Sequence, residues 1–222
     1  MLVIFTIGHS TRTWEAFLEL LRTHGIRRVV DVRSIPRSRH NPQFTRETLS
    51  RKLRSARIGY VHLRRLGGLR HARRDSQNMG WRNTSFRGFA DYMQTPEFEA
   101  GLQRLIKLVK QKKSALMCAE PMPWRCHRSL IADVLVVRGI RVTDIIGGKR
   151  CHVHVLTSFG RVRGDRITYP LATASRISTA IASSFFPVRD LSKDFLRLAE
   201  NNPGCIGGRI CSWIEGDPGF PR

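Results

Sequence analysis

Acidic residues are scarce in this chain. The sequence contains 17 Asp and Glu against 39 Lys and Arg, which gives a formal net charge of +22 over 222 residues. The excess is concentrated in residues 27–74, where 15 Arg and Lys accompany only Asp31 and Glu47. The imbalance leaves two interpretations: a solvated basic face in an Arg-rich protein, or a surface that binds nucleic acid or another polyanion.

Long apolar runs and a regular cysteine pattern are also missing. No stretch of 18 apolar residues occurs, so no transmembrane helix is expected. The first residues, MLVIFTIGHST, lack the basic segment and cleavage site of a signal peptide and are expected to form a buried strand. Five cysteines at irregular spacing argue against a disulfide framework and favour the reducing cytoplasm.

Hydrophobic periodicity predicts alternating strands and helices. Strands are expected at residues 2–7, 28–32, 59–63, 114–119 and 141–145. Helices are expected after Thr13, from Thr45 to about Arg57, after Thr95 and at 128–138, whereas residues 64–87 are expected to form a long loop. This order predicts an α/β fold: a small, mostly parallel sheet with helices on both faces.

The sequence pattern weakens after residue 146. We expect an α/β domain over residues 1–150, and an edge strand with a linker over 151–170. Residues 171–222 mix Ser, Ala, Pro and Gly, with one helix expected around Leu191–Leu198. That part is predicted to be an irregular, poorly ordered C-terminal extension.

Polar residues follow three of the expected strands. His9 and Ser10 end the first strand, Asp31 and Arg33 end the second, and Cys118 and Glu120 end the strand at 114–119; in each of the last two pairs the side chains share a face. Ligands of open α/β sheets bind outside the carboxyl ends of the strands. The sequence therefore predicts one polar site at that edge.

A second group of polar residues begins the helix at 128–138. Cys126, His127 and Arg128 are consecutive, and a helix N-terminus favours an anion or a thiolate. Cys126 is therefore expected to be the more reactive thiol. Cys118, at the end of a buried strand, is expected to have a raised pKa.

The motifs TIGHST, DVRSIPRSR, LGG and CAEPMPWRCHR together resemble a bacterial and archaeal family, domain of unknown function 488, over residues 3–146. The resemblance implies a small α/β domain and the following signature residues: His9, Ser10, Asp31, Arg33, Pro36, Ser38, Arg39, Cys118, Glu120, Cys126, His127 and Arg128. In the family pattern a His precedes the Ile that closes the last strand. Asp144 takes that place here, which puts activity in doubt if the His belongs to the site.

Three classes of function are compatible with these residues. The first is an enzyme or binding protein for a phosphate-bearing ligand, nucleic acid included. Its expected catalytic residues are Cys126, His127, Glu120, Cys118, Asp31 and His9, and its expected anion-binding residues are Ser10, Arg33, Ser38, Arg39 and Arg128. The thiol spacing matches neither a cysteine phosphatase loop nor a C-x-x-C motif.

The second class is a non-catalytic nucleic-acid-binding module that uses Arg51, Arg54 and Arg57 in the basic 27–74 region. The third is a zinc-binding domain. Two groups have suitable chemistry, namely Cys118 with Cys126 and His127, and Cys151 with His152 and His154. Neither has the paired spacing of known zinc sites, so the sequence assigns no metal ligands. It names no cofactor and fixes no oligomeric state.

Overall fold

The computed structural model describes residues 1–171, and the expected helix around Leu191–Leu198 and most of the expected extension lie outside them. Six strands form one sheet in the order β3-β2-β4-β1-β5-β6. Their bounds are β1 Val3–Gly8, β2 Arg28–Asp31, β3 Gly59–His62, β4 Ser114–Cys118, β5 Arg141–Gly147 and β6 Arg150–Val153. The first five are parallel and β6 pairs antiparallel with β5, so the predicted α/β fold with a mostly parallel sheet is confirmed.

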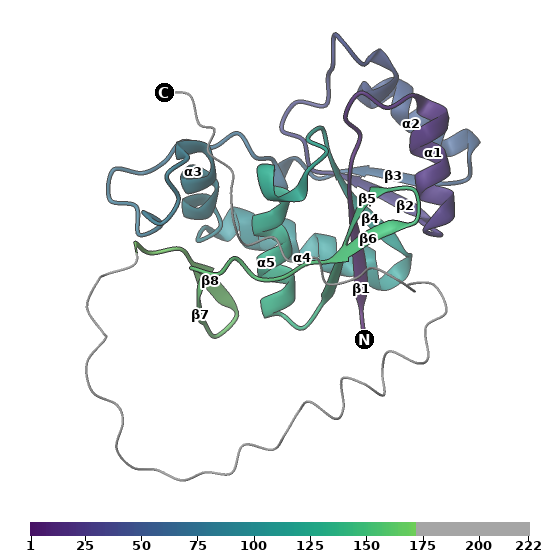
Figure 1. Ribbon diagram of the computed structural model, residues 1–222. Helices are drawn as coiled ribbons and strands as arrows, with labels where there is room; N and C mark the ends of the chain where they lie inside the picture. Colours follow the sequence, from purple (N-terminus) through teal and green to yellow (C-terminus); the bar gives the residue numbers. More distant parts are fainter. Residues whose placement is uncertain (172–222) are drawn as a thin grey trace, which may run out of the picture. The chain divides into compact units, whose positions relative to one another are not determined.

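Five α-helices cover both faces of this sheet (Figure 1). On one face, α1 (Trp14–Thr23) and α2 (Arg46–Ser55) pack their buried apolar residues against Ile7, Val29 and Met117. On the other, α3 (Thr84–Tyr92), α4 (Pro96–Gln111) and α5 (Arg128–Val137) form the larger core. Among residues 1–171, no helix is both long and apolar enough to cross a membrane.

Local signals explain where the helices begin and end. The Thr13 and Thr95 hydroxyls accept hydrogen bonds from the backbone N–H groups of Ala16 and Phe98, as expected of N-caps. Gly25 and Gly139 follow α1 and α5 with positive φ angles of 61° and 71°, a left-handed conformation that glycine adopts easily.

One helix lies where a loop was expected. Residues 64–87 were predicted to be a long loop, but α3 begins at Thr84 inside that range. The Asn83 side chain caps it by accepting from the N–H groups of Ser85 and Phe86, and Phe89 is fully buried. The Gly- and Arg-rich composition before Asn83 hid this helix start.

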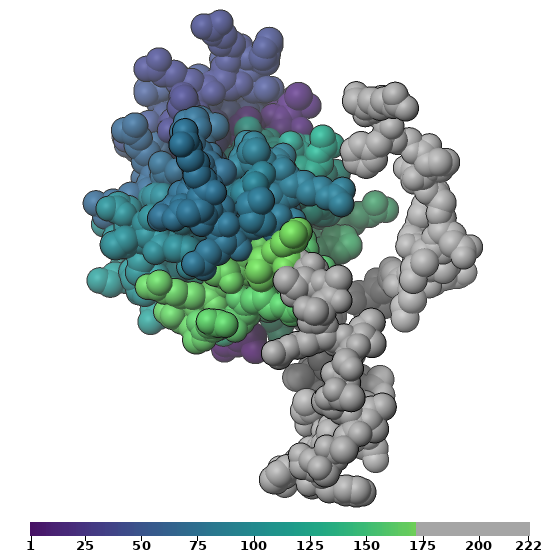
Figure 2. Space-filling view, turned by 90° about the vertical axis from the view of Figure 1, so that its left-hand side faces the viewer, coloured from purple at the N-terminus to yellow at the C-terminus, as the bar shows by residue number. Residues whose placement is uncertain are grey.

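The segment after β6 returns to the larger core. The strands β7 (Arg161–Arg163) and β8 (Arg166–Thr168) form a separate two-stranded hairpin. Ile167 and Tyr169 are buried, and the Tyr169 N–H donates to Asn78 Oδ1 at 2.9 Å. Figure 2 shows this green segment lying against the blue segment that contains α3.

Candidate functional site

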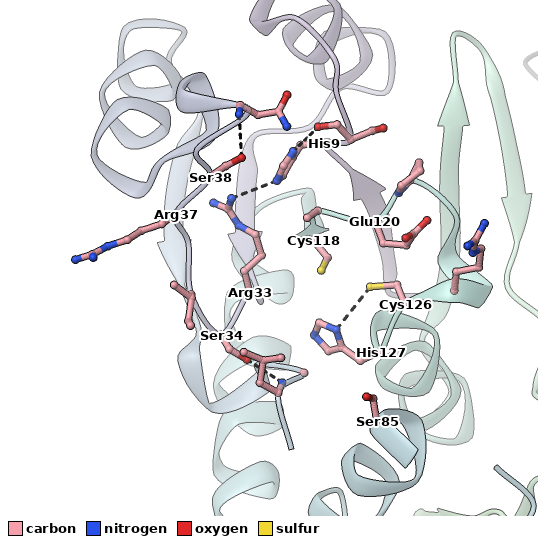
Figure 3. A pocket seen from close by; sticks show the side chains of 18 of the residues that line it. His9, Arg33, Ser34, Arg37, Ser38, Ser85, Cys118, Glu120, Cys126 and His127 are labelled. Atoms are coloured by element: carbon pink, nitrogen blue, oxygen red, sulfur yellow. Dashed lines mark hydrogen bonds between the residues drawn. The ribbon is translucent and has the colours of Figure 1, made fainter. Parts of the chain in front are cut away.

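The carboxyl ends of three adjacent strands surround one cavity. Strand β4 lies between β2 and β1, so the residues that follow these strands meet at one edge of the sheet. The cavity there has a volume of about 590 Å³. His9 and Ser10, Arg33, and Cys118 with Glu120 line it from the three strand ends, and Cys126 and His127 line it from the start of α5 (Figure 3).

A buried ion pair forms one wall of the cavity. Arg33 Nε donates to Asp31 Oδ1 at 2.9 Å, and Arg33 Nη2 donates to Asp31 Oδ2 at 2.6 Å. The side chains are only 6% and 0% exposed, and the Tyr60 hydroxyl donates to the same carboxylate. Asp31 does not reach the cavity surface, and its carboxylate compensates and orients Arg33 from behind.

His9 holds the other side of the Arg33 guanidinium. Its Nδ1 lies 2.8 Å from the Ser10 carbonyl oxygen, which can only accept, so the proton is on Nδ1. The unprotonated Nε2 then accepts from Arg33 Nη1 at 3.2 Å. Burial, the largest cause, lowers the pKa of His9, and the ring stacks on Phe44. His9 is thus a neutral partner of Arg33 with no free lone pair to act as a base.

Ser10 and Ser38 occupy special positions at the cavity. Ser10 has a φ of 51°, a left-handed conformation that is uncommon for a residue with a side chain, and its N–H donates to the Ala119 carbonyl. Ser38 Oγ accepts from the Asn41 N–H at 3.0 Å. Both serines line the cavity and can offer a hydroxyl proton to a ligand.

Cys118 and Cys126 lie next to each other, beside His127. The Cys126 Sγ lies 3.6 Å from His127 Nδ1. A hydrogen bond from the Cys126 thiol, the largest cause, acts together with the Glu120 N–H; it outweighs burial and holds the pKa of Cys118 well below its ordinary value. The neighbouring Cys118 sulfur and burial raise the pKa of Cys126. The structure therefore reverses the expected order of the two thiols, because their mutual contact outweighs the helix N-terminus.

Backbone carbonyls fix the orientation of His127. Its Nε2 lies 3.2 Å from the carbonyl oxygens of both Val32 and Leu66, so the Nε2 proton is donated to them. Gly68 lies against the ring, and a Cβ there would come within 2.4 Å of His127 Nδ1. This close approach explains the second glycine of the LGG motif.

Two residues expected at the anion site do not line the cavity. Arg128 is 1% exposed, and its guanidinium donates to the carbonyl oxygens of Glu120 and Pro121, so it braces the loop after β4. A buried guanidinium needs hydrogen-bond acceptors. The carbonyl oxygens of Glu120 and Pro121 can serve because both residues lie beyond the end of β4 at Cys118. Arg39 is exposed outside the cavity.

The lining also contains residues that the sequence did not single out. Arg37 and Arg125 bring two further guanidinium groups, while Ile35, Leu69 and Phe86 bring apolar surface. Ser34, Asn41 and Ser85 add polar groups. The DVRSIPRSR and CAEPMPWRCHR motifs already contain Arg37 and Arg125, but α3 and its Phe86 were hidden inside an expected loop.

The basic helix α2 is a separate feature. Its Leu49 and Leu53 are buried in the core, while Arg51 and Arg54 are exposed on the opposite side. Arg57, also exposed, follows the helix with a φ of 59°. None of these arginines lines the cavity.

Asp144 and His154 belong to a second buried polar cluster away from the cavity. His154 Nε2 lies 2.8 Å from Asp133 Oδ1, and its Nδ1 lies 3.5 Å from Asp144 Oδ2. The Thr6 and Tyr169 hydroxyls donate to Asp144 and Asp133 respectively. Asp144 does not line the cavity. Both ring nitrogens of His154 face carboxylates, so His154 is not available to a metal group with Cys151 and His152.

The fold and cavity define the class of protein: an α/β protein with a ligand-sized cavity at the carboxyl ends of its parallel strands. The family model "Domain of unknown function DUF488" matches residues 13–135, and the chain belongs to this family, as its motifs indicated. In comparisons with curated proteins and with solved structures, nothing matches this chain.

Proposed function

We propose that the cavity binds a phosphate-bearing small molecule and places it against the Cys118, Cys126 and His127 side chains. The observation that carries the proposal is the charge of the lining: three arginines, Arg33, Arg37 and Arg125, accompany one carboxylate, Glu120. A guanidinium presents a planar set of donors that matches phosphate oxygens. The volume of about 590 Å³ is in the range of small-molecule sites.

The three arginines would contribute in different ways. Arg33 is held between Asp31 and His9, so its position is fixed before a ligand arrives and little entropy is lost on binding. Arg37 and Arg125 are exposed and free to close on a ligand. Ser10 and Ser38 add hydroxyl donors beside them.

The apolar lining suggests what the rest of the ligand resembles. Ile35 and Leu69 are 62% and 69% exposed, and Phe86 lies near them in the lining. Apolar side chains beside the arginines of the lining favour a ligand that carries an apolar or flat part beside its phosphate. A nucleotide has this combination.

The groups able to act on such a ligand are the two thiols and His127. Glu120 lies in the same wall and can accept a proton or a hydrogen bond. Two neighbouring cysteines that remain unbridged favour a reducing compartment, so the proposal places the protein in the cytoplasm.

Binding to arginine variants tests this proposal. Inorganic phosphate and a panel of nucleotides are titrated calorimetrically into the full-length protein, into Arg37→Ala and Arg125→Ala, and into Arg104→Ala as a control. Arg104 is exposed on α4, away from the cavity. Each cavity variant should weaken binding about tenfold or more, since a charge-assisted hydrogen bond contributes about 1.5–3 kcal/mol. The proposal fails if no phosphate compound binds, or if all variants bind equally.

A second candidate function is nucleic-acid binding by α2. The observation that favours it is the exposure of Arg51, Arg54 and Arg57, which lie on α2 and just after it. This surface would contact the phosphate backbone without reading sequence.

A further inference from the structure

Three soft donor atoms converge in the cavity wall. The Sγ atoms of Cys118 and Cys126 and a ring nitrogen of His127 all lie within 4.8 Å of one another. They come from two places in the fold: the end of β4, and the turn that leads into α5. In Figure 3 both sulfur atoms and the His127 ring face a common space.

The His127 tautomer suits a metal ligand. Nε2–H is donated to the Val32 and Leu66 carbonyl oxygens, which leaves the lone pair of Nδ1 facing Cys126. Metal-binding histidines characteristically donate their other ring N–H to a carbonyl or a carboxylate, which fixes the ring and increases its basicity. Because residue 68 is glycine, no Cβ crowds the Nδ1 atom, which such a carbon would approach within 2.4 Å.

The spacing of the donor atoms also fits a tetrahedral ion. A Zn–S bond of about 2.3 Å and a Zn–N bond of about 2.1 Å at the tetrahedral angle place the two atoms roughly 3.6 Å apart. Cys126 Sγ and His127 Nδ1 are 3.6 Å apart in the structure.

We propose that Cys118, Cys126 and His127 bind one zinc ion, or a similar soft divalent metal, whose fourth position opens into the cavity. Two thiolates and one imidazole form a donor set that favours zinc. Three protein ligands with an open position are typical of catalytic rather than structural zinc sites. All three ligands line the cavity, so the open position faces the space where a ligand would lie.

This inference deepens the proposed function and rests on it for one step only, the contact between metal and ligand. A zinc ion held by these three residues would polarise a phosphate oxygen, or activate a water, bound at its open fourth position. The metal site itself depends only on the three donor atoms, so it can be tested without any phosphate compound.

The test is a titration of cobalt(II) into the reduced, chelator-treated, full-length protein. Cobalt(II) replaces zinc and absorbs light. We expect one ion per chain, a near-ultraviolet thiolate-to-cobalt band, and visible bands typical of tetrahedral coordination. Zinc should then displace the cobalt. The inference is overturned if the wild-type protein binds no cobalt, or binds it without the thiolate band.

Variants locate the site. Cys118→Ser and Cys126→Ser, each checked for folding by circular dichroism, should weaken cobalt binding by more than about 100-fold, because even the loss of a residue that only hydrogen-bonds to a metal ligand weakens metal binding about 10–100-fold. Cys151→Ser is the matched control, since it removes a thiol outside the cluster. Unchanged binding in both cluster variants, or loss in Cys151→Ser alone, would refute the assignment.

The same proteins separate this inference from the proposed function. Arg37→Ala and Arg125→Ala should bind cobalt like the wild type, because neither side chain belongs to the donor set. Inorganic phosphate added to the cobalt protein should change the visible bands if phosphate reaches the metal. A cobalt spectrum in a protein that binds no phosphate compound would support the metal site while refuting the proposed function. Phosphate binding in a protein that binds no cobalt would support the proposed function while refuting the metal site.

Discussion

The Arg33 guanidinium donates a hydrogen bond to His9 Nε2, 3.2 Å away, while its opposite edge holds Asp31 with two bonds of 2.9 and 2.6 Å. The positive charge is therefore fixed at the cavity between a carboxylate and a neutral imidazole. Since Asp31 is fully buried, most of its role is to make the buried charge of Arg33 tolerable.

Replacing Asp31 by Asn should destabilise the protein by about 3 kcal/mol, because removing one partner leaves the Arg33 charge buried without compensation. Urea unfolding monitored by circular dichroism measures the loss. Asp75→Asn is the control: it breaks the Arg73–Asp75 ion pair, whose side chains are 66% and 71% exposed, and should leave the unfolding midpoint unchanged. Equal effects of the two substitutions would contradict this account.

In the metal-free, reduced protein, iodoacetamide should modify Cys118 before Cys126 at neutral pH. The pKa of Cys118 is lowered chiefly by the hydrogen bond from Cys126, whereas the pKa of Cys126 is raised. Cys126→Ala removes that donor and should shift the reaction of Cys118 to higher pH, while Cys126→Ser, which keeps a donor, should shift it less. Mass spectrometry of the modified peptides gives the rates. Faster modification of Cys126 would restore the order expected from the sequence.

Stability should fall as the pH rises above 6.5 because of His154. Burial disfavours its charged form, but the hydrogen bonds and charges of Asp133 and Asp144 outweigh burial and raise the pKa of His154 to about 9. A group whose pKa is higher in the folded than in the unfolded protein contributes its full stabilisation at pH values below the unfolded pKa, here near 6.5. That stabilisation is lost as the pH rises through the folded pKa of about 9. The expected loss is on the order of 2 kcal/mol. Urea unfolding between pH 6 and pH 10 should show it, and His154→Gln should flatten this part of the profile. An equally steep profile in the variant would assign the effect to another group.

If α2 binds nucleic acid, Arg51→Glu/Arg54→Glu/Arg57→Glu should weaken binding to duplex DNA and flatten its salt dependence. Each phosphate contact contributes about −0.9 to the log–log slope, so three lost contacts should reduce the slope by roughly 2.7. Fluorescence anisotropy at several salt concentrations measures both quantities. The matched control changes the same number of exposed charges on α4, at Arg104, Lys107 and Lys110. Equal weakening in both triple variants would show that net charge, and not α2, determines binding.

The sequence predicted the sheet because its signals are local. Apolar runs ending in polar residues located β1, β2 and β4, and threonine caps located α1 and α4. Parallel strands bring their carboxyl ends to one edge, so the meeting of His9, Arg33 and Cys118 followed from the strand positions.

The sequence did not predict features that depend on distances between segments far apart in the chain. Which of Cys118 and Cys126 has the lower pKa depends on the contact between their sulfur atoms, and the spacing of the two residues in the sequence does not predict that contact. The positions of the Arg37 and Arg128 guanidinium groups depend on the paths of two loops. The Arg37 side chain lines the cavity, whereas Arg128 donates to backbone carbonyl oxygens of the loop after β4. The pairing of Asp144 with His154 likewise depends on the β5–β6 register.

The burial of Tyr169 indicates how much of the chain a stable domain needs. Its ring is fully buried and its hydroxyl donates to Asp133 on α5 at 2.7 Å, although Tyr169 lies 34 positions beyond residue 135, where the family match ends. A fragment cut at residue 147, after the last parallel strand, would leave the Asp133 carboxylate without Tyr169 and His154 and would uncover the apolar surface beneath the β7–β8 hairpin. Residues 1–174 form one compact unit, so we expect a stable domain to need the chain at least to Tyr169, well past the region that the family motifs mark.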